Sequence, residues 1–301
     1  MKIVHVTGYF QPELGYEEYY LSLNQKKLGH DVYVITSDRI ANLPNLRDSL
    51  KEIKSKCSTR FRPIGFSEID GIKVYRLKTL FEAKDFLVVK GMKKILREIK
   101  PDVVHSHEPR QFMTMLPAFY KRELNYKLIV DQHDYDIFPT IKSKLMTYLV
   151  RRNICRFAFK KADKIIAITP ESREFIKNVY GIKKEIIDST LGADIERFKF
   201  NPKKREEIRE KFGIKDREIL LITVGHVGRN KKLEFLIEAF SKTKNSKLLI
   251  VGGGDEEYIK ELKELAIKLS VKDRIIFLGR VSQNELPYYY SAADMGDWPS
   301  R

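Results

Sequence analysis

The sequence contains few of the residues that covalent or metal cross-links require. Cys57 and Cys155 are its two cysteines, and neither lies in a CxxC or Cys/His pattern. This spacing argues against a disulfide scaffold and against a zinc site, so we expect two reduced structural thiols. No apolar run approaches the roughly 20 residues that a membrane span needs, since even the first run, 3–6, is interrupted by His5. We therefore expect an unsecreted, cytoplasmic protein.

Acidic residues are also scarce relative to basic ones, 41 against 57, which gives a formal net charge of +16. Up to residue 165 there are 31 Lys and Arg against 19 Asp and Glu (+12), and 26 against 22 thereafter (+4). The electrostatic field of such an excess of positive charge attracts anionic partners, and phospholipid surfaces are among them. Lysine-rich helix faces that are simply exposed to solvent would explain the excess of positive charge equally well. The basic residues form no stripe interleaved with exposed aromatics, so we expect no nucleic-acid partner.

One predicted helix, 142–162, concentrates this positive charge. Its basic residues include Arg151, Arg152, Arg156, Lys160 and Lys161. The sequence therefore predicts a second mode of localisation, peripheral association with the anionic inner face of a membrane.

Short β-rich runs alternate with helical segments along the whole chain. The expected strands are 2–7, 31–36, 71–77, 102–107, 127–131 and 164–169, and then 219–225, 247–251 and 274–279. The expected helices are 17–28, 46–54, 88–99, 112–124, 142–162, 171–180, 205–212, 233–241, 258–269 and 285–293. This alternation predicts an α/β fold with parallel sheets and right-handed crossovers.

The length favours two domains. We expect one Rossmann-like, doubly wound domain over 1–180 and another over 181–301. The second has only three expected strands, so we expect it to be incomplete at its C-terminal side.

Polar and glycine-rich segments follow several expected strands, at the edge where open α/β sheets bind ligands. His107 and His133 follow two of them; a lone histidine there is as often structural as functional, but two favour function. The loop 225–231 unites glycines with Arg229 and Lys231, groups that suit a diphosphate, although a solvated basic loop is the alternative. Gly15 lies between a strand and a helix, where a turn is more common than a phosphate cradle. Residues 252–254 lack GxGxxG spacing, so we interpret them as a tight turn that lets backbone approach a ligand.

The ordered set of motifs resembles the retaining glycosyltransferases of the GT-B fold, family 4. The segments that carry the resemblance are MKIVHV with PELG, LGHDV, DVVHSH, ADKIIA, LGAD with RF, the run from Gly225 to Phe240, LIVGGG, RIIFLG, and AD through PS at 299–300. Together they extend over essentially the whole chain. The resemblance implies two Rossmann-like domains that face a cleft, and a cytoplasmic enzyme that transfers a sugar from a nucleotide-diphosphate donor to a glycan or lipid-linked acceptor with retention.

Individual roles are implied by the same resemblance. Lys231 and a nearby basic residue would hold the donor diphosphate, Gly15 would let the first loop approach it, and His133 would lie beside the transferred sugar. Neither a metal nor another cofactor is implied. The implied donor-binding residues are Gly15, Gly225, His226, Arg229, Lys231, Gly254, Arg280 and Val281, with backbone around the last two meeting the base. His107 and Asp134 are the acceptor-side candidates, and His133 is the catalytic one.

Three departures from the family pattern matter. Tyr16 stands where the family has a second loop glycine, and His226 stands where it has an arginine, for which Arg229 can compensate. The family's pair of glutamates just after the Pro-Ser is absent, so we expect a truncated chain of doubtful activity. A nucleotide-sugar epimerase of the same fold and an inactive fragment are the alternative functions.

Overall fold

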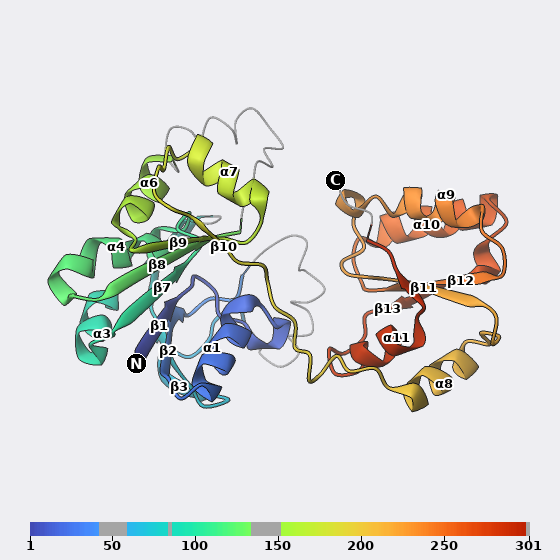
Figure 1. Cartoon of the computed structure of the whole chain (residues 1–301), viewed down its shortest axis with the longest axis horizontal. Helices are drawn as coiled ribbons and strands as arrows, with labels where there is room; N and C mark the ends of the chain where they lie inside the picture. The colour runs from blue at the N-terminus through green and yellow to red at the C-terminus, as the bar shows by residue number, and fades with distance from the viewer. Residues whose placement is uncertain (42–58, 84–85, 134–151, 299–301) are drawn as a thin grey trace. The chain divides into compact units, whose positions relative to one another are not determined.

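The structure is a computed structural model that describes residues 1–41, 59–83, 86–133 and 152–298. These residues form two compact units, one of 1–41 and 59–191 and the other of 192–298 (Figure 1). The first unit extends beyond the expected boundary at 180, because strand β10 (Ile187–Asp188) pairs with its sheet. The expected helix 46–54 lies outside the described residues, as does the first part of the expected helix 142–162.

The first unit is built on an eight-stranded sheet of order β10-β9-β8-β7-β1-β2-β4-β3. Its strands are β1 (Lys2–Val6), β2 (Asp31–Ser37), β3 (Gly65–Ile69), β4 (Ile72–Leu77), β7 (Val103–His107), β8 (Lys127–Gln132), β9 (Lys164–Ala167) and β10. All neighbours are parallel except β3 and β4, which form an antiparallel edge pair. The strand order turns back at β1, as expected of a doubly wound sheet.

Helices cover this sheet because their apolar residues meet the apolar strands. They are α1 (Glu17–Lys27), α3 (Met92–Ile99), α4 (Phe112–Leu124), α6 (Arg152–Lys161) and α7 (Pro170–Asn178). A large core joins α3, α4, α6 and α7 to the central strands and includes the buried Cys155, while a smaller core lies around Phe10 beneath α1. The two cores agree with a sheet that is covered on both faces.

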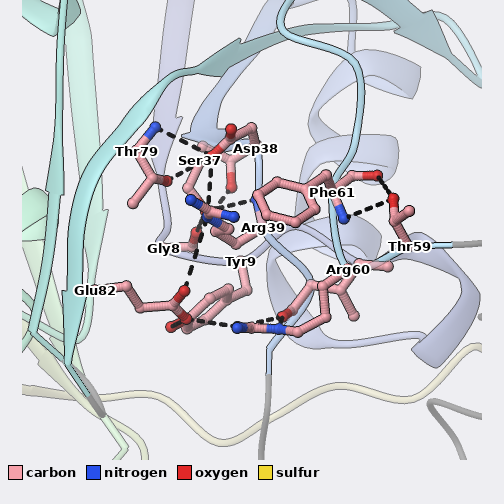
Figure 2. A network of polar contacts seen from close by, with 12 residues as sticks. Gly8, Tyr9, Ser37, Asp38, Arg39, Thr59, Arg60, Phe61, Thr79 and Glu82 are labelled. Atoms are coloured by element: carbon pink, nitrogen blue, oxygen red, sulfur yellow. Dashed lines mark hydrogen bonds and ion pairs between the residues drawn. The ribbon is translucent and has the colours of Figure 1, made fainter.

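A β-hairpin of β5 (Thr79–Ala83) and β6 (Phe86–Val89) replaces the start of the helix that the sequence predicts from residue 88. The helix α3 begins at Met92 instead, after Gly91 adopts φ 98°. A polar network ties the hairpin to the carboxyl edge of the sheet (Figure 2). In it, Glu82 accepts hydrogen bonds from Arg60 at 2.6 Å and from the Tyr9 hydroxyl at 2.9 Å.

The second unit contains a four-stranded parallel sheet of order β13-β12-β11-β14. Its strands are β11 (Ile219–Val224), β12 (Ser246–Val251), β13 (Ile275–Gly279) and the short β14 (Met295–Gly296), which adds one strand to the three expected. The helices α8 (Pro202–Lys211), α9 (Leu233–Ser241), α10 (Glu256–Lys268) and α11 (Leu286–Ala292) enclose two cores, one of them lined by α9 and α10 and the other by α8 and α11. Within the described part of the chain, no helix is long and apolar enough to cross a membrane.

Candidate functional site

The carboxyl edge of the second unit's sheet brings two backbone turns into close contact. Gly225 follows β11 at φ 150°, and Gly252 follows β12 at φ 146°. A Cβ atom on Gly252 would lie 1.8 Å from the Gly225 carbonyl oxygen, and one on Gly254 would lie 2.1 Å from the Val227 oxygen. Since neither side chain could be accommodated without movement, these glycines are required by the local packing. The expected tight turn at 252–254 is therefore a point of close backbone approach.

A small hollow of about 50 Å³ opens beside these turns. Lys231 and the half-buried His226 line it, together with Gly225 and the indole of Trp298. Leu233, the first residue of α9, also lines it, so the positive end of that helix lies beside the same space. A lysine, a helix N-terminus and exposed backbone at one sheet edge form a setting that suits an anionic group.

Arg229 has a different environment from Lys231, although both belong to the short 3-10 helix Arg229–Lys231. Its guanidinium donates to both carboxylate oxygens of Glu261 at 2.8 and 2.6 Å and lies over the ring of Tyr258. Residues two apart in a 3-10 helix point about 120° away from each other. The structure therefore places Arg229 with α10 and outside the residues that line the hollow, where sequence reasoning had grouped it with Lys231.

Arg280 and Val281 follow β13 at the same carboxyl edge. A Cβ atom on Gly253 would lie 3.9 Å from the Cβ of Arg280, so this part of the β12 turn is close to the end of β13. Val281 packs against the core formed by α8 and α11. This edge thus carries the donor-side residues that the sequence suggested in this unit, and the guanidinium of Arg229 is paired with Glu261 on α10.

The first unit holds a cluster of buried imidazoles around one carboxylate at the corresponding edge of its own sheet. Asp131, in β8, is 1% exposed, and its Oδ2 lies 2.5 Å from His107 Nδ1 and 3.0 Å from His105 Nε2. Its Oδ1 accepts the backbone N–H of Glu108 at 3.0 Å. Burial would raise the pKa of Asp131, but His107 and the hydrogen bonds from the imidazoles lower it well below its usual value. Asp131 is thus a buried carboxylate anion.

A relay of hydrogen bonds continues from this carboxylate into the sheet. His107 Nε2 lies 2.9 Å from His5 Nδ1, and His5 Nε2 lies 2.8 Å from the Gln25 side-chain oxygen. Burial alone would lower the pKa of His107, yet Asp131 raises it, whereas burial and His107 lower the pKa of His5 well below its usual value. In the protonation pattern that fits these contacts, a cationic His107 forms an ion pair with Asp131 and donates from Nε2 to a neutral His5, which in turn donates to Gln25.

His133 directly follows β8 and forms the accessible end of the cluster. Its Nε2 lies 2.8 Å from Glu17 Oε2 and 3.7 Å from Asp131 Oδ1, and its side chain is 25% exposed. Burial lowers the pKa of this imidazole, but the carboxylates of Asp131 and Glu17 outweigh that effect and raise it to about 11. The ring is therefore an imidazolium at neutral pH.

These ligand types can also bind metal ions. Among the described residues, potential ligand atoms lie within 4.8 Å of one another in two groups, His5 with His105 and His107, and His107 with Asp131 and His133. In the second group the cationic rings of His107 and His133 already contact the carboxyl oxygens of Asp131 and Glu17. The positive and negative charges of this group are therefore balanced in pairs.

The acceptor-side and loop candidates of the first unit have different environments in the structure. His107 is 5% exposed and works within the relay, so it cannot meet an acceptor directly. Asp134 lies outside the described residues. Gly15 follows the 3-10 helix Pro12–Leu14 with φ 65°, and Tyr16, 39% exposed, precedes the first residue of α1. Gly15 thus forms the turn that precedes α1, whose first residue, Glu17, contacts His133.

Sequence reasoning missed Asp131, Glu17, His5 and His105 in the first unit and Trp298 in the second. Asp131 was taken as the last residue of a strand, although a carboxylate in a buried run is a signal in itself, since such groups are rarely buried without partners. Trp298 donates from Nε1 to the Val224 carbonyl oxygen at 3.1 Å and is the chain's single tryptophan.

Each of the two units matches a known protein family. Residues 19–189 match the family described as Glycosyltransferase Family 4, and residues 204–301 match Glycosyl transferases group 1. The alpha-monoglucosyldiacylglycerol synthase of Streptococcus pneumoniae is 26% identical over 67% of this chain and 47% of its own length. The GDP-mannose-dependent alpha-(1-6)-phosphatidylinositol monomannoside mannosyltransferase of Mycolicibacterium smegmatis is 23% identical over 77% of this chain and 59% of its own. The chain thus spans about half the length of these curated relatives.

Solved structures show which fold the chain has. The crystal structure of Anabaena HepE in complex with UDP superposes with a TM-score of 0.69 at 16% identity and covers 98% of this chain and 73% of that one. This likeness establishes the GT-B fold. The chain belongs to glycosyltransferase family 4, within the group 1 glycosyltransferases of GT-B fold.

Proposed function

We propose that this chain acts in retaining glycosyl transfer from a nucleotide-diphosphate sugar to a glycan or lipid-linked acceptor, without a metal ion. The observation that carries the proposal is the hollow of the second unit, where Lys231 and the first turn of α9 meet the close backbone turns at Gly225 and Gly252. A cationic side chain and a helix terminus can stabilise the charge of a departing nucleoside diphosphate, which is the role that a metal ion has in other transferases.

We assign Lys231 to the diphosphate and the backbone around Arg280 and Val281 to the base. His226 completes the lining of the hollow but lacks the permanent charge that an arginine would bring. The complex of HepE with UDP and the GDP-mannose dependence in the name of the mycobacterial relative support a nucleoside diphosphate as the ligand class. The nucleotides named for these two proteins have different bases, uracil and guanine, so the proposal does not specify the base of the donor.

We assign His133 of the first unit to the transferred sugar. Because its ring is cationic at neutral pH, it suits hydrogen-bond donation to a sugar or phosphate oxygen and does not suit proton abstraction.

We propose a lipid-linked acceptor over a soluble glycan, with docking to an anionic membrane surface. Helix α6 carries Arg152, Arg156, Lys160 and Lys161, and the names of both curated relatives include a lipid. Each basic residue near an anionic surface contributes about 1 kcal/mol, so four would give measurable binding. Sedimentation with vesicles that contain phosphatidylserine should deplete the protein at low salt, and equal binding to neutral vesicles would contradict the electrostatic docking.

Intrinsic fluorescence provides the experiment that tests the donor site, since Trp298 is the chain's single tryptophan and lines the hollow. Titration with UDP, GDP and ADP should change its emission at lower concentration than the matching monophosphates, because the second phosphate adds charge at Lys231. Equal responses to diphosphates and monophosphates would contradict the assignment.

Product analysis separates transfer from epimerisation. A transferase releases nucleoside diphosphate only when an acceptor is added, whereas an epimerase consumes the nucleotide-sugar without releasing nucleotide. Proton NMR of the product's anomeric coupling tests retention.

A further inference from the structure

Two carboxylates from different elements converge on one nitrogen of His133. Glu17 is the first residue of α1, and its Oε2 lies 2.8 Å from His133 Nε2. Asp131 belongs to β8, two residues before His133, and its Oδ1 lies 3.7 Å from the same nitrogen. This one nitrogen thus meets a carboxylate from the helix and a carboxylate from the strand.

Asp131 is a rigid support for this contact because it cannot move independently. Its carboxylate is 1% exposed and is fixed by His105, His107 and the backbone N–H of Glu108. Buried ion pairs packed this closely restrict their members to one arrangement. The only part of the cluster with substantial exposure to solvent is the pair formed by Glu17 and His133, each 25% exposed at its side chain.

We propose that Asp131 and Glu17 are positioning residues that hold the His133 ring in one orientation, with Nε2 turned toward the protein and Nδ1 left to donate to a substrate oxygen. The orientation of the ring follows from the protein's own contacts. The contact with substrate rests on the proposed function. Neither carboxylate is assigned to touch the substrate, so each acts through His133.

The charges around the ring support this role. Glu17 and Glu18 face it from α1, Asp131 from β8, and Glu108 from the segment after β7, while His107 is the positive neighbour in β7. Burial raises the pKa of Glu18, so the carboxylates of Asp131 and Glu17 supply most of the attraction, and they raise the pKa of His133 to about 11. A doubly protonated ring donates from both nitrogens and can accept no proton. Loss of either carboxylate should therefore restore titration and let the ring turn.

NMR titration of the ligand-free chain labelled with ¹³C-histidine tests the clamp directly. The His133 Cε1–H resonance, assigned by its loss in His133→Gln, should keep the imidazolium position between pH 6 and pH 9. Glu17→Gln and Asp131→Asn should each lower its titration midpoint by at least one pH unit, a tenfold change in proton affinity. Glu123→Gln, which removes an exposed carboxylate bound to Lys93 and Arg97, is the matched control and should leave the resonance unchanged. A His133 that titrates near pH 6.5 in the natural chain, or midpoints unmoved in folded Glu17→Gln, would overturn the clamp. If Asp131→Asn fails to fold, Glu17→Gln still decides, because Glu17 is partly exposed.

Turnover measurements test the positioning role. In Glu17→Gln, kcat for transfer should fall at least tenfold, while the dissociation constant for nucleoside diphosphate, measured by the fluorescence of Trp298, should stay the same. Its rate should also fall as pH rises through the new His133 midpoint, whereas the natural chain should show no such limb between pH 6 and pH 9. An unchanged pH profile in an active Glu17→Gln variant would overturn the positioning role. A chain that shows the predicted NMR behaviour but transfers no sugar would instead contradict the proposed function and leave the clamp intact.

Discussion

Replacing Lys231 by alanine should weaken the binding of a nucleoside diphosphate more than any other single charge removal in the loop 225–231. Lys231 lines the hollow, whereas the guanidinium of Arg229 is bound to Glu261 through both carboxylate oxygens. A hydrogen bond to a charged group is worth about 1.5–3 kcal/mol, which corresponds to a roughly 10- to 150-fold higher dissociation constant for Lys231→Ala. Arg229→Ala removes an exposed ion pair, so we expect less than a threefold change.

The fluorescence of Trp298 and isothermal calorimetry give independent measures of this affinity. Lys232→Ala is the matched control, because it removes the same charge one residue along the chain from a side chain that lies 4.0 Å from Glu234. All variants should keep the natural circular dichroism spectrum and melting temperature. An affinity that is unchanged in Lys231→Ala, or lowered equally in the Lys232→Ala control, would refute the assignment of Lys231 to the diphosphate.

Gly252→Ala should lower the melting temperature of the second unit, because its Cβ would lie 1.8 Å from a backbone oxygen, while Gly253→Ala, whose Cβ would meet its first neighbour at 3.9 Å, should be tolerated. Glu82→Gln should accelerate amide exchange in the β5–β6 hairpin, because it weakens the ion pair to Arg60 and the network of Figure 2; unchanged exchange would show that the hairpin is held otherwise. His133→Gln should reduce the urea midpoint of unfolding most near pH 6 and less as pH rises toward 11. The pKa of His133 is raised to about 11 in the folded chain and is near 6.5 in the unfolded chain. The stabilisation that the charged ring contributes is therefore complete below pH 6.5 and is lost as pH approaches 11. A difference that grows with pH would contradict this sign.

The alternation of strands and helices was predictable because each regular segment carries its own periodic signal. Apart from β10 and β14, the parallel strands of both sheets lie within a few residues of the expected ranges. The hairpin was missed because a short apolar run such as 86–89 is compatible with either a strand or a helix. The short strands β10 and β14 were missed because two residues carry no period, and their pairing depends on sheets that are already formed.

The histidine cluster depends on information that no local pattern contains. His105 and His107 share one face of β7 by alternation, but the parallel register decides which residues meet them. That register places His5 opposite His105 and Asp131 opposite His107. A shift of one residue would turn Asp131 to the other face of the sheet. The sequence could therefore suggest His107 and His133 as strand-end residues, but not the carboxylate that joins them or the role of His107 as a buried member of a relay.

The two sheet edges have different chemistry, and this difference predicts how their variants should separate. The second unit offers backbone, a helix terminus and an exposed lysine, which bind charge that a nucleoside diphosphate carries in the ground state as well as in the transition state. The first unit offers one imidazolium held between the buried Asp131 and the partly exposed Glu17, and this ring can act only on an oxygen that binds next to it. Substitutions at Lys231 should therefore appear mainly in donor affinity, and substitutions at Glu17 or Asp131 mainly in kcat. If both sets changed donor affinity alike, the division of roles between the two edges would be wrong, even with every residue placed as the structure has it.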